Sequence, residues 1–189
     1  AKLNCIFVVQ FLEWPIALPR TRLISRLNNV MFCRSVLKSV DATVVISAFL
    51  ESLVVAKNEQ SGESKPCCRI PILVDLLSMS GVVATRRERP YVLYCANMDA
   101  YGDDALYVVD AFARANVADT ELLMVGKATP FTEARIREKA AALGLSSRVV
   151  VMNDYLETEA LYGLFKGAKA LLAPIHDDVR SLARFPFKV

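Results

Sequence analysis

From residue 91 to residue 174 the sequence alternates four short apolar runs with three longer segments of helical pattern. Apolar runs of about six residues, bounded by turn-forming residues, are typical of strands that are buried on both faces. Strict alternation of such strands with helices predicts an α/β fold with a doubly wound parallel sheet. The four predicted strands are YVLYCA (91–96), ELLMVG (121–126), RVVVMN (148–153) and KALLAP (169–174).

The helical segments between these strands carry start and stop signals. Thr129 can cap the second predicted helix, Pro130 suits its first turn, and Gly144 suits a left-handed C-cap. Glu133 and Arg137 are spaced i,i+4 and are expected to pair on its surface. The three predicted helices cover residues 103–116, 131–145 and 157–168.

The first 90 residues predict part of a second α/β domain with a less regular pattern. Residues 76–90 lack a helical or strand period and are interpreted as a linker or loop. We therefore predict two domains, 1–85 and 86–189. The earlier predicted elements are strands at 5–12, 41–47 and 68–75 and helices at 20–40 and 48–58. The apolar face expected for the first helix consists of Leu23, Leu27, Val30, Met31, Val36 and Leu37.

Composition favours a folded chain without a membrane span. The apolar fraction is 54% and the mean hydropathy is +0.33, yet no run of about 18 uncharged apolar residues occurs. The five cysteines show no CxxC spacing, and the adjacent Cys67 and Cys68 lack nearby histidines, so no metal site is expected. Free thiols suit a reducing cytoplasm, and no signal peptide is recognised at the N-terminus.

Positive charge is concentrated in the first 40 residues, where six basic side chains stand against Glu13 alone. An excess of this kind suggests a polyanionic neighbour, either an anionic membrane surface or a nucleic acid. The alternative is a solvated helix face without a partner. The basic residues concerned lie mainly between Arg20 and Lys38.

Several catalytic classes are excluded by missing motifs. The segment CANMDAYG has one glycine, so it is not the GxGxxG fingerprint of dinucleotide-binding proteins. Neither a GxxxxGK[ST] phosphate loop nor a GxSxG elbow is present. His176 is the only histidine, which leaves at most one candidate for histidine-based catalysis; the alternative is an ordinary loop residue.

Polar residues collect where the predicted strands end. In an open parallel sheet, ligands bind outside the carboxyl ends of the strands, where helix N-termini can present N–H groups to phosphate. Cations in two of these segments make a nucleoside diphosphate the natural candidate ligand, although polar loops occur in any sheet of this kind. The segments are residues 96–102, 126–130, 152–157 and 174–188.

The order of these segments resembles the GT-B glycosyltransferases, in particular the retaining family 4 group. YCANMDAYG (94–102) occupies the place of a family segment of the form YVGRLDPEKG, and residues 122–175 follow the family pattern through "LLMVG", "LGL", "ALYGLF" and "ALLAPI". Upstream, DATVVISAFLESL (41–53) and RIPILVD (69–75) are similar to segments that close the family's N-terminal domain. The resemblance implies a Rossmann-like donor domain preceded by part of an acceptor-side domain.

The resemblance also implies a set of donor-binding residues and two departures from the family. Asn97 and Tyr101 stand where an arginine and a lysine commonly meet the donor diphosphate, so Arg180, Arg184 and Lys188 are expected to substitute. In the family's Glu-x7-Glu element, Ala183 takes the first position and the second falls beyond Val189, so we expect an incomplete chain. The remaining predicted donor-binding residues are Gly126, Lys127, Asn153, Tyr155 and His176.

On this resemblance we expect a cytoplasmic, hexosyltransferase-like glycosyltransferase that moves a sugar from a nucleotide-sugar to an acceptor with retention. The nucleotide-sugar would be a substrate; no cofactor, metal or nucleic-acid partner is expected, and residues 20–38 could dock on anionic lipid. A non-catalytic nucleotide-binding or interaction module with the same fold is the main alternative, and an epimerase or phosphorylase of GT-B architecture is a third.

Overall fold

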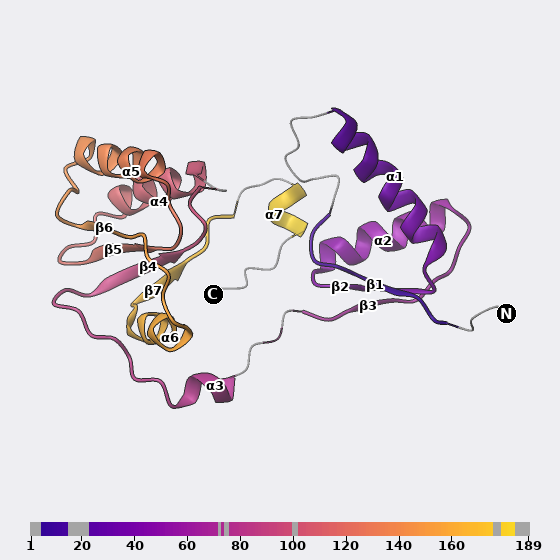
Figure 1. Ribbon diagram of the computed structural model, residues 1–189, viewed down its shortest axis with the longest axis horizontal. Coiled ribbons are helices and arrows are strands. Elements are labelled where there is room, and N and C mark those ends of the chain that lie inside the picture. The colour runs from indigo at the N-terminus through magenta and orange to yellow at the C-terminus, as the bar shows by residue number, and fades with distance from the viewer. Residues whose placement is uncertain are drawn as a thin grey trace. The chain divides into compact units, whose positions relative to one another are not determined.

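The computed structural model describes residues 5–14, 23–71, 73, 76–99, 102–175 and 179–183. These residues form two compact units (Figure 1). Unit 1 contains the described residues of Ala1–Leu73 and Ile175–Phe187, and unit 2 contains those of Val74–Pro174. The predicted domain boundary after residue 85 lies within a connection that packs in unit 2, and it stays a prediction.

Unit 2 is built on a four-stranded parallel sheet in the order β6-β5-β4-β7. The alternating strands and helices confirm the predicted α/β doubly wound sheet. Its elements are α3 (Leu76–Ser80), β4 (Tyr91–Cys95), α4 (Gly102–Ala115), β5 (Glu121–Val125), α5 (Pro130–Ala142), β6 (Val149–Met152), α6 (Thr158–Gly167) and β7 (Ala170–Leu172).

Helices cover both faces of this sheet, with α4 and α5 on one side and α6 on the other (Figure 1). Successive residues of β5 point to opposite faces, so Leu122 and Met124 join the core under α4 and α5. Leu123 and Val125 join the core under α6. All four side chains are buried, which explains why β5 reads as an unbroken apolar run.

The signals predicted for α5 are confirmed. Thr129 is its N-cap and accepts a hydrogen bond from the N–H of Thr132, and Pro130 is its first residue. Arg137 and Glu133 pair with 2.6 Å between nitrogen and oxygen. Gly144 follows the helix with φ +70°, the left-handed conformation that glycine adopts without strain.

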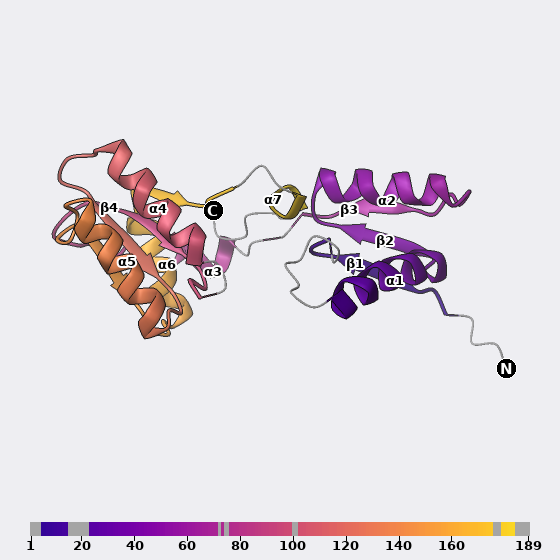
Figure 2. The same ribbon diagram turned by 90° about the horizontal axis from the view of Figure 1, so that it is seen from above.

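Unit 1 contains a three-stranded parallel sheet in the order β1-β2-β3, seen side by side in Figure 2. Both α1 and α2 pack on the same face, because Leu37 and Val54 belong to one core with Phe11 and Val45. The elements are β1 (Val8–Phe11), α1 (Leu23–Ser39), β2 (Ala42–Val45), α2 (Ala48–Gln60), β3 (Cys67–Arg69) and α7 (Val179–Ala183).

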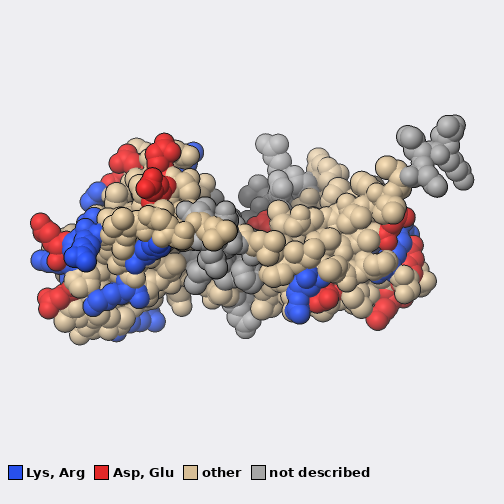
Figure 3. Space-filling model, turned by 90° about the horizontal axis from the view of Figure 1, so that it is seen from below, with Lys and Arg blue, Asp and Glu red and all other residues tan. Residues whose placement is uncertain are grey.

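The other face of the unit 1 sheet has no helix over it among the described residues. Val8 and Gln10 of β1 point to that side and are exposed, and Val44 of β2 is half-buried. Figure 3 views this side, and the part of unit 1 not hidden by grey atoms shows few charged side chains. The described residues of unit 1 therefore form one layer of helices on a sheet, whereas unit 2 has helices on both faces of its sheet.

Segment α7 packs into unit 1 although it follows the last strand of unit 2. Ala183 is buried in the same core as Phe11 and Leu50, and its carbonyl accepts a 3.3 Å hydrogen bond from the Ser47 hydroxyl. Ser47 is also the N-cap of α2. The chain thus returns to unit 1 after Pro174.

Three details differ from the sequence-based prediction. Of the described residues in the strand predicted over 68–75, only Cys68 and Arg69 belong to β3; β2 ends at Val45, so the bond from the N–H of Ile70 to the Val45 carbonyl is the last between the two strands. The predicted loop 76–90 begins with the short helix α3. The apolar face predicted for α1 is wrong for Leu27 and Met31, which are 56% and 65% exposed.

The connection between α3 and β4 is held against α6. The N–H of Thr85 donates to the Gly163 carbonyl at 2.8 Å, and the Lys166 ammonium donates to the carbonyls of Ser80 and Val82. The close approach requires a glycine at position 167, because a Cβ there would lie 2.1 Å from the Thr85 carbonyl oxygen.

Among the described residues, none of the helices combines the length and apolar character needed to cross a membrane.

Candidate functional site

The topology of unit 2 gathers three loops at one edge of the sheet. Because β4, β5 and β6 are parallel and adjacent, the segments that follow them emerge side by side. The chain places β5 and β7 on opposite sides of β4, so the direction of winding reverses there. In doubly wound sheets the ligand crevice lies outside the carboxyl ends of the strands at such a reversal.

Gly126 brings the first two loops into backbone contact. Its φ is +134°, and a Cβ at this position would lie 2.0 Å from the carbonyl oxygen of Ala96. The contact continues through a 2.8 Å hydrogen bond from the N–H of Met98 to the carbonyl of Lys127. Met98 is itself fully buried, so this part of the edge is anchored in the core.

Asp99 adds a charged link between the same loops. Its carboxylate accepts a 2.6 Å hydrogen bond from the backbone N–H of Thr129. This bond is the main reason that the pKa of Asp99 lies below its ordinary value, and the positive charge of Lys127 acts in the same direction. The carboxylate is thus held as an anion beside the start of α5.

Asn153 ties the third loop to the second. Its side-chain oxygen accepts a 2.9 Å hydrogen bond from the N–H of Ala128, and its side-chain nitrogen donates to the carbonyl of the same residue. One amide therefore satisfies both backbone groups of Ala128, whose side chain is buried. The three loops form one connected backbone framework.

We expect the Asp99 contact to make stability depend on acid pH. A folded-state pKa below the unfolded value contributes stability above about pH 4, which is lost as the pH falls through the folded pKa. Replacing Asp99→Asn should flatten the dependence of the unfolding free energy on pH in this acid range. Urea unfolding at a series of pH values, with exposed Asp154→Asn as control, measures it; equal slopes for both variants would contradict the assignment.

Three predicted donor-binding side chains lie exposed on this framework, one from each loop: Asn97, Lys127 and Tyr155. Tyr155 is 90% exposed, so nearly its whole ring is open to a ligand. Gly126 and Asn153 have the structural contacts given above, and their part in donor binding stays a prediction.

The other predicted site residues are not placed together with these. Arg180 belongs to α7 in unit 1, and its side chain is outside the description. The remaining residues lie outside the described part of the chain: Tyr101, His176, Arg184 and Lys188.

The helix N-termini at this edge differ in how many of their N–H groups are bonded within the protein. At the start of α5 the N–H groups of Thr129, Thr132 and Glu133 are bonded within the protein, and Pro130 has none. Acids occupy the first turns of α4 and α6, including Asp103 and Glu159, and offset the positive ends of those helix dipoles. The N-cap of α6, Glu157, makes no side-chain hydrogen bond to the first turn of that helix, so phosphate binding by helix N–H groups stays a prediction, and Lys127 is an exposed cation at the same edge.

The sequence analysis did not predict the hydrogen bond between the Asp99 carboxylate and the N–H of Thr129. Each is polar and follows a strand, which is the only local signal. Their contact depends on the register of β4 and β5, in which Cys95 lies beside Val125.

Among the described residues no group of three or more His, Cys, Asp or Glu side chains could hold a metal ion.

No protein-family model matches the chain, and no curated protein matches its sequence. Solved structures do match its fold. Sucrose-phosphate synthase from Thermosynechococcus elongatus is 17% identical, with a TM-score of 0.66 over 90% of this chain and 44% of that chain. A UDP-forming α,α-trehalose-phosphate synthase from Burkholderia xenovorans is 14% identical, with a TM-score of 0.63 over 89% and 47%. A glycosyltransferase from Rickettsia africae is 15% identical, with a TM-score of 0.62 over 89% and 45%.

These structures are GT-B glycosyltransferases, and the likeness confirms the predicted GT-B fold for this chain. The chain spans less than half the length of each. Membership of family 4 stays a prediction.

Proposed function

We propose that the chain is part of a glycosyltransferase and that unit 2 binds its nucleotide-sugar donor. The observation that carries this proposal is the framework at the carboxyl ends of β4, β5 and β6, where Asp99 and Asn153 join three loops. Lys127 and Tyr155 are exposed on these hydrogen-bonded loops, where they can contact a donor, and the sheet belongs to a GT-B fold.

The chemistry proposed is sugar transfer with retention, in which the protein positions two substrates and stabilises a leaving diphosphate. Positive charge near the diphosphate lowers the barrier to its departure. Because acids in the first turns of α4 and α6 offset the helix dipoles in part, cationic side chains are needed beside the helix N-termini. We assign this role to Lys127, with Arg180, Arg184 and Lys188, while the exposed ring of Tyr155 offers a surface for the nucleoside.

The proposed enzyme is cytoplasmic, takes a hexose from its nucleotide-sugar donor and needs no further cofactor.

Docking on anionic lipid through residues 20–38 is a separate part of the proposal. Of the basic side chains in that segment, Arg34 and Lys38 are described, and both are exposed. Sedimentation with vesicles that contain or lack anionic lipid tests it, and equal binding to both would count against it.

Replacing Lys127→Ala should weaken binding of the preferred nucleotide-sugar about tenfold, because one charge-assisted contact to phosphate is lost. Lys169→Ala is a matched control, since Lys169 precedes β7 and lies at the opposite edge of the sheet. Calorimetric titration with UDP-, GDP- and ADP-sugars measures both variants. Unchanged affinity in Lys127→Ala would remove this residue from the donor site.

A non-catalytic module is the second candidate, favoured by Asn97 and Tyr101 in place of the family's cations and by the acids that begin α4 and α6. The same titration separates the two functions. Donor binding with slow hydrolysis of the nucleotide-sugar supports an enzyme, and the absence of binding to all three donors supports the module.

A further inference from the structure

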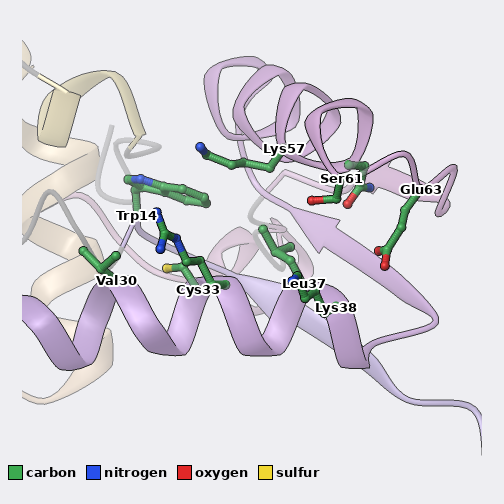
Figure 4. A pocket seen from close by; sticks show the side chains of 10 residues that line it. Trp14, Val30, Cys33, Leu37, Lys38, Lys57, Ser61 and Glu63 are labelled. Atoms are coloured by element: carbon green, nitrogen blue, oxygen red, sulfur yellow. The ribbon is translucent and has the colours of Figure 1, made fainter.

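Unit 1 contains a cavity of about 260 Å³ between α1 and α2 (Figure 4). This volume is just below the range typical of drug-sized ligands, so it suits a small molecule. The lining of the cavity comes entirely from residues between Trp14 and Glu63. The cavity therefore belongs to unit 1 alone and involves none of the unit 2 loops described above.

Helical spacing directs one face of each helix into this cavity. On α1 the lining residues follow positions i, i+3, i+4, i+7 and i+8, beginning at Val30. On α2, Lys57 and Asn58 line it, and the Lys57 side chain extends from the helix toward Trp14 (Figure 4). Cys33 and Leu37 rise from α1 on the opposite side.

Positive charge dominates the polar part of the lining. Arg34, Lys38 and Lys57 contribute three cations. In the described part of the chain neither Arg34 nor Lys38 has a side-chain hydrogen bond or ion pair, and Lys57 donates to the neutral amide of Gln60. None of these three cations pairs with an acid among the described residues, so together they attract an anion to the cavity.

The only acid of the lining is already neutralised. Glu63 pairs with Lys65 at 2.7 Å. The Lys65 ammonium also donates to the carbonyls of Leu37 and Lys38, the last turn of α1. Lys65 thereby offsets the partial negative charge at the C-terminal end of that helix, which would otherwise repel an anion.

Asn58 indicates what the rest of the ligand contains. Its side chain is only 6% exposed, and its nitrogen makes a long 3.5 Å contact with the Lys65 carbonyl. No donor to its side-chain oxygen is found among the described residues, and a buried acceptor left without a donor is costly. A ligand hydroxyl would supply that donor, and Ser61 adds a second polar side chain to the lining.

Apolar side chains complete the cavity. Trp14, Cys33 and Leu37 are buried and line it. Burial raises the pKa of the Cys33 thiol, so this side chain stays neutral and does not oppose an anion. The C–H faces of a sugar or polyol pack well on such a surface.

We propose that this cavity is a binding site for a small phosphate monoester with a hydroxylated body, of the sugar-phosphate class. Arg34, Lys38 and Lys57 bind the phosphate, and Asn58 accepts from a hydroxyl. Lys38, Lys57 and Ser61 lie at the C-terminal ends of α1 and α2. The cavity shares no lining residue with the loops of unit 2 to which the donor is assigned, so its ligand acts as an effector and not as the donor.

Calorimetric titration with a hexose monophosphate tests this site, with the uncharged hexose and inorganic phosphate for comparison. We expect the hexose monophosphate to bind more tightly than either, and the double variant Arg34→Gln/Lys38→Gln to bind it at least about tenfold more weakly. Arg69→Gln, at a half-exposed residue of the same unit that does not line the cavity, should bind as the unaltered protein does.

Two results would overturn the proposal. One is hexose monophosphate binding that the double variant leaves unchanged, which would place the ligand elsewhere. The other is a lack of binding by a chain that still sediments with phosphatidate vesicles, which would assign the cations to a lipid headgroup. Thermal unfolding of each variant shows whether it is folded, and Arg34→Lys, which keeps the charge, should retain binding.

Discussion

Gly126→Ala is expected to destabilise unit 2 by about 3 kcal/mol or more and to abolish donor binding. Two separate costs add at this position. A φ of +134° is strained for any residue with a Cβ, and that Cβ would lie 2.0 Å from the Ala96 carbonyl oxygen. Because the obstacle is backbone, a side-chain rotation cannot relieve it, and the loops after β4 and β5 have to separate.

Gly144→Ala is the matched control for this prediction. Gly144 also has a positive φ, +70°, but an added Cβ would meet nothing within 4 Å. It should therefore cost only the conformational strain, about 1 kcal/mol. Urea unfolding followed by circular dichroism measures both variants. Equal losses would show that the close approach of the two loops contributes nothing.

Gly167→Ala is expected to release the connection between α3 and β4 from α6. An added Cβ would lie 2.1 Å from the Thr85 carbonyl oxygen and 2.6 Å from the Tyr91 hydroxyl. Alanine is a better helix former by about 1 kcal/mol, but overpacking against backbone costs about 1–3 kcal/mol. The Tyr91 hydroxyl, which donates to the Leu164 carbonyl at 2.8 Å, would lose that position.

Hydrogen exchange at the Thr85 amide measures this release directly, since that N–H is bonded to the Gly163 carbonyl. Gly163→Ala is a control from which we expect a smaller effect than from Gly167→Ala. Its nearest obstacle is the Thr85 hydroxyl at 2.6 Å, a side-chain atom that can rotate away, and the nearest backbone atom is the Val83 carbonyl oxygen at 3.1 Å, farther than the 2.1 Å at Gly167. Gly81→Ala meets nothing within 4 Å and should leave exchange unchanged. Faster exchange in Gly163→Ala than in Gly167→Ala would contradict the argument.

Local sequence signals predicted unit 2 well, because most of its elements are decided by neighbouring residues. The apolar run of β5, the Thr129 cap and the Gly144 stop all act within a few positions of the element that they define. The order of the strands in the sheet could not be predicted from such local signals. It depends on β7 pairing with β4, whose residues are separated by about 80 positions.

Features decided by distant contacts were the ones that the sequence did not predict. Helix α3 ends where Lys166 of α6 reaches the Ser80 carbonyl. The link between Asp99 and Thr129 joins loops 30 positions apart. In unit 1, the helix period was correct for α1 and the predicted Leu37 is buried, but Leu27 and Met31 are exposed, and Cys33, which was not part of the predicted face, is buried.

The return of α7 to unit 1 has a consequence for synthesis on the ribosome. Ala183, buried against the core of unit 1, is made only after Leu172 has completed the sheet of unit 2. More than a hundred residues are therefore synthesised between Ser47, the N-cap of α2, and Ala183, whose carbonyl accepts the hydrogen bond from the Ser47 hydroxyl. Unit 2 can finish folding while unit 1 is still unfinished, although unit 1 supplies the earlier strands, so the order of translation and the order of completion are reversed.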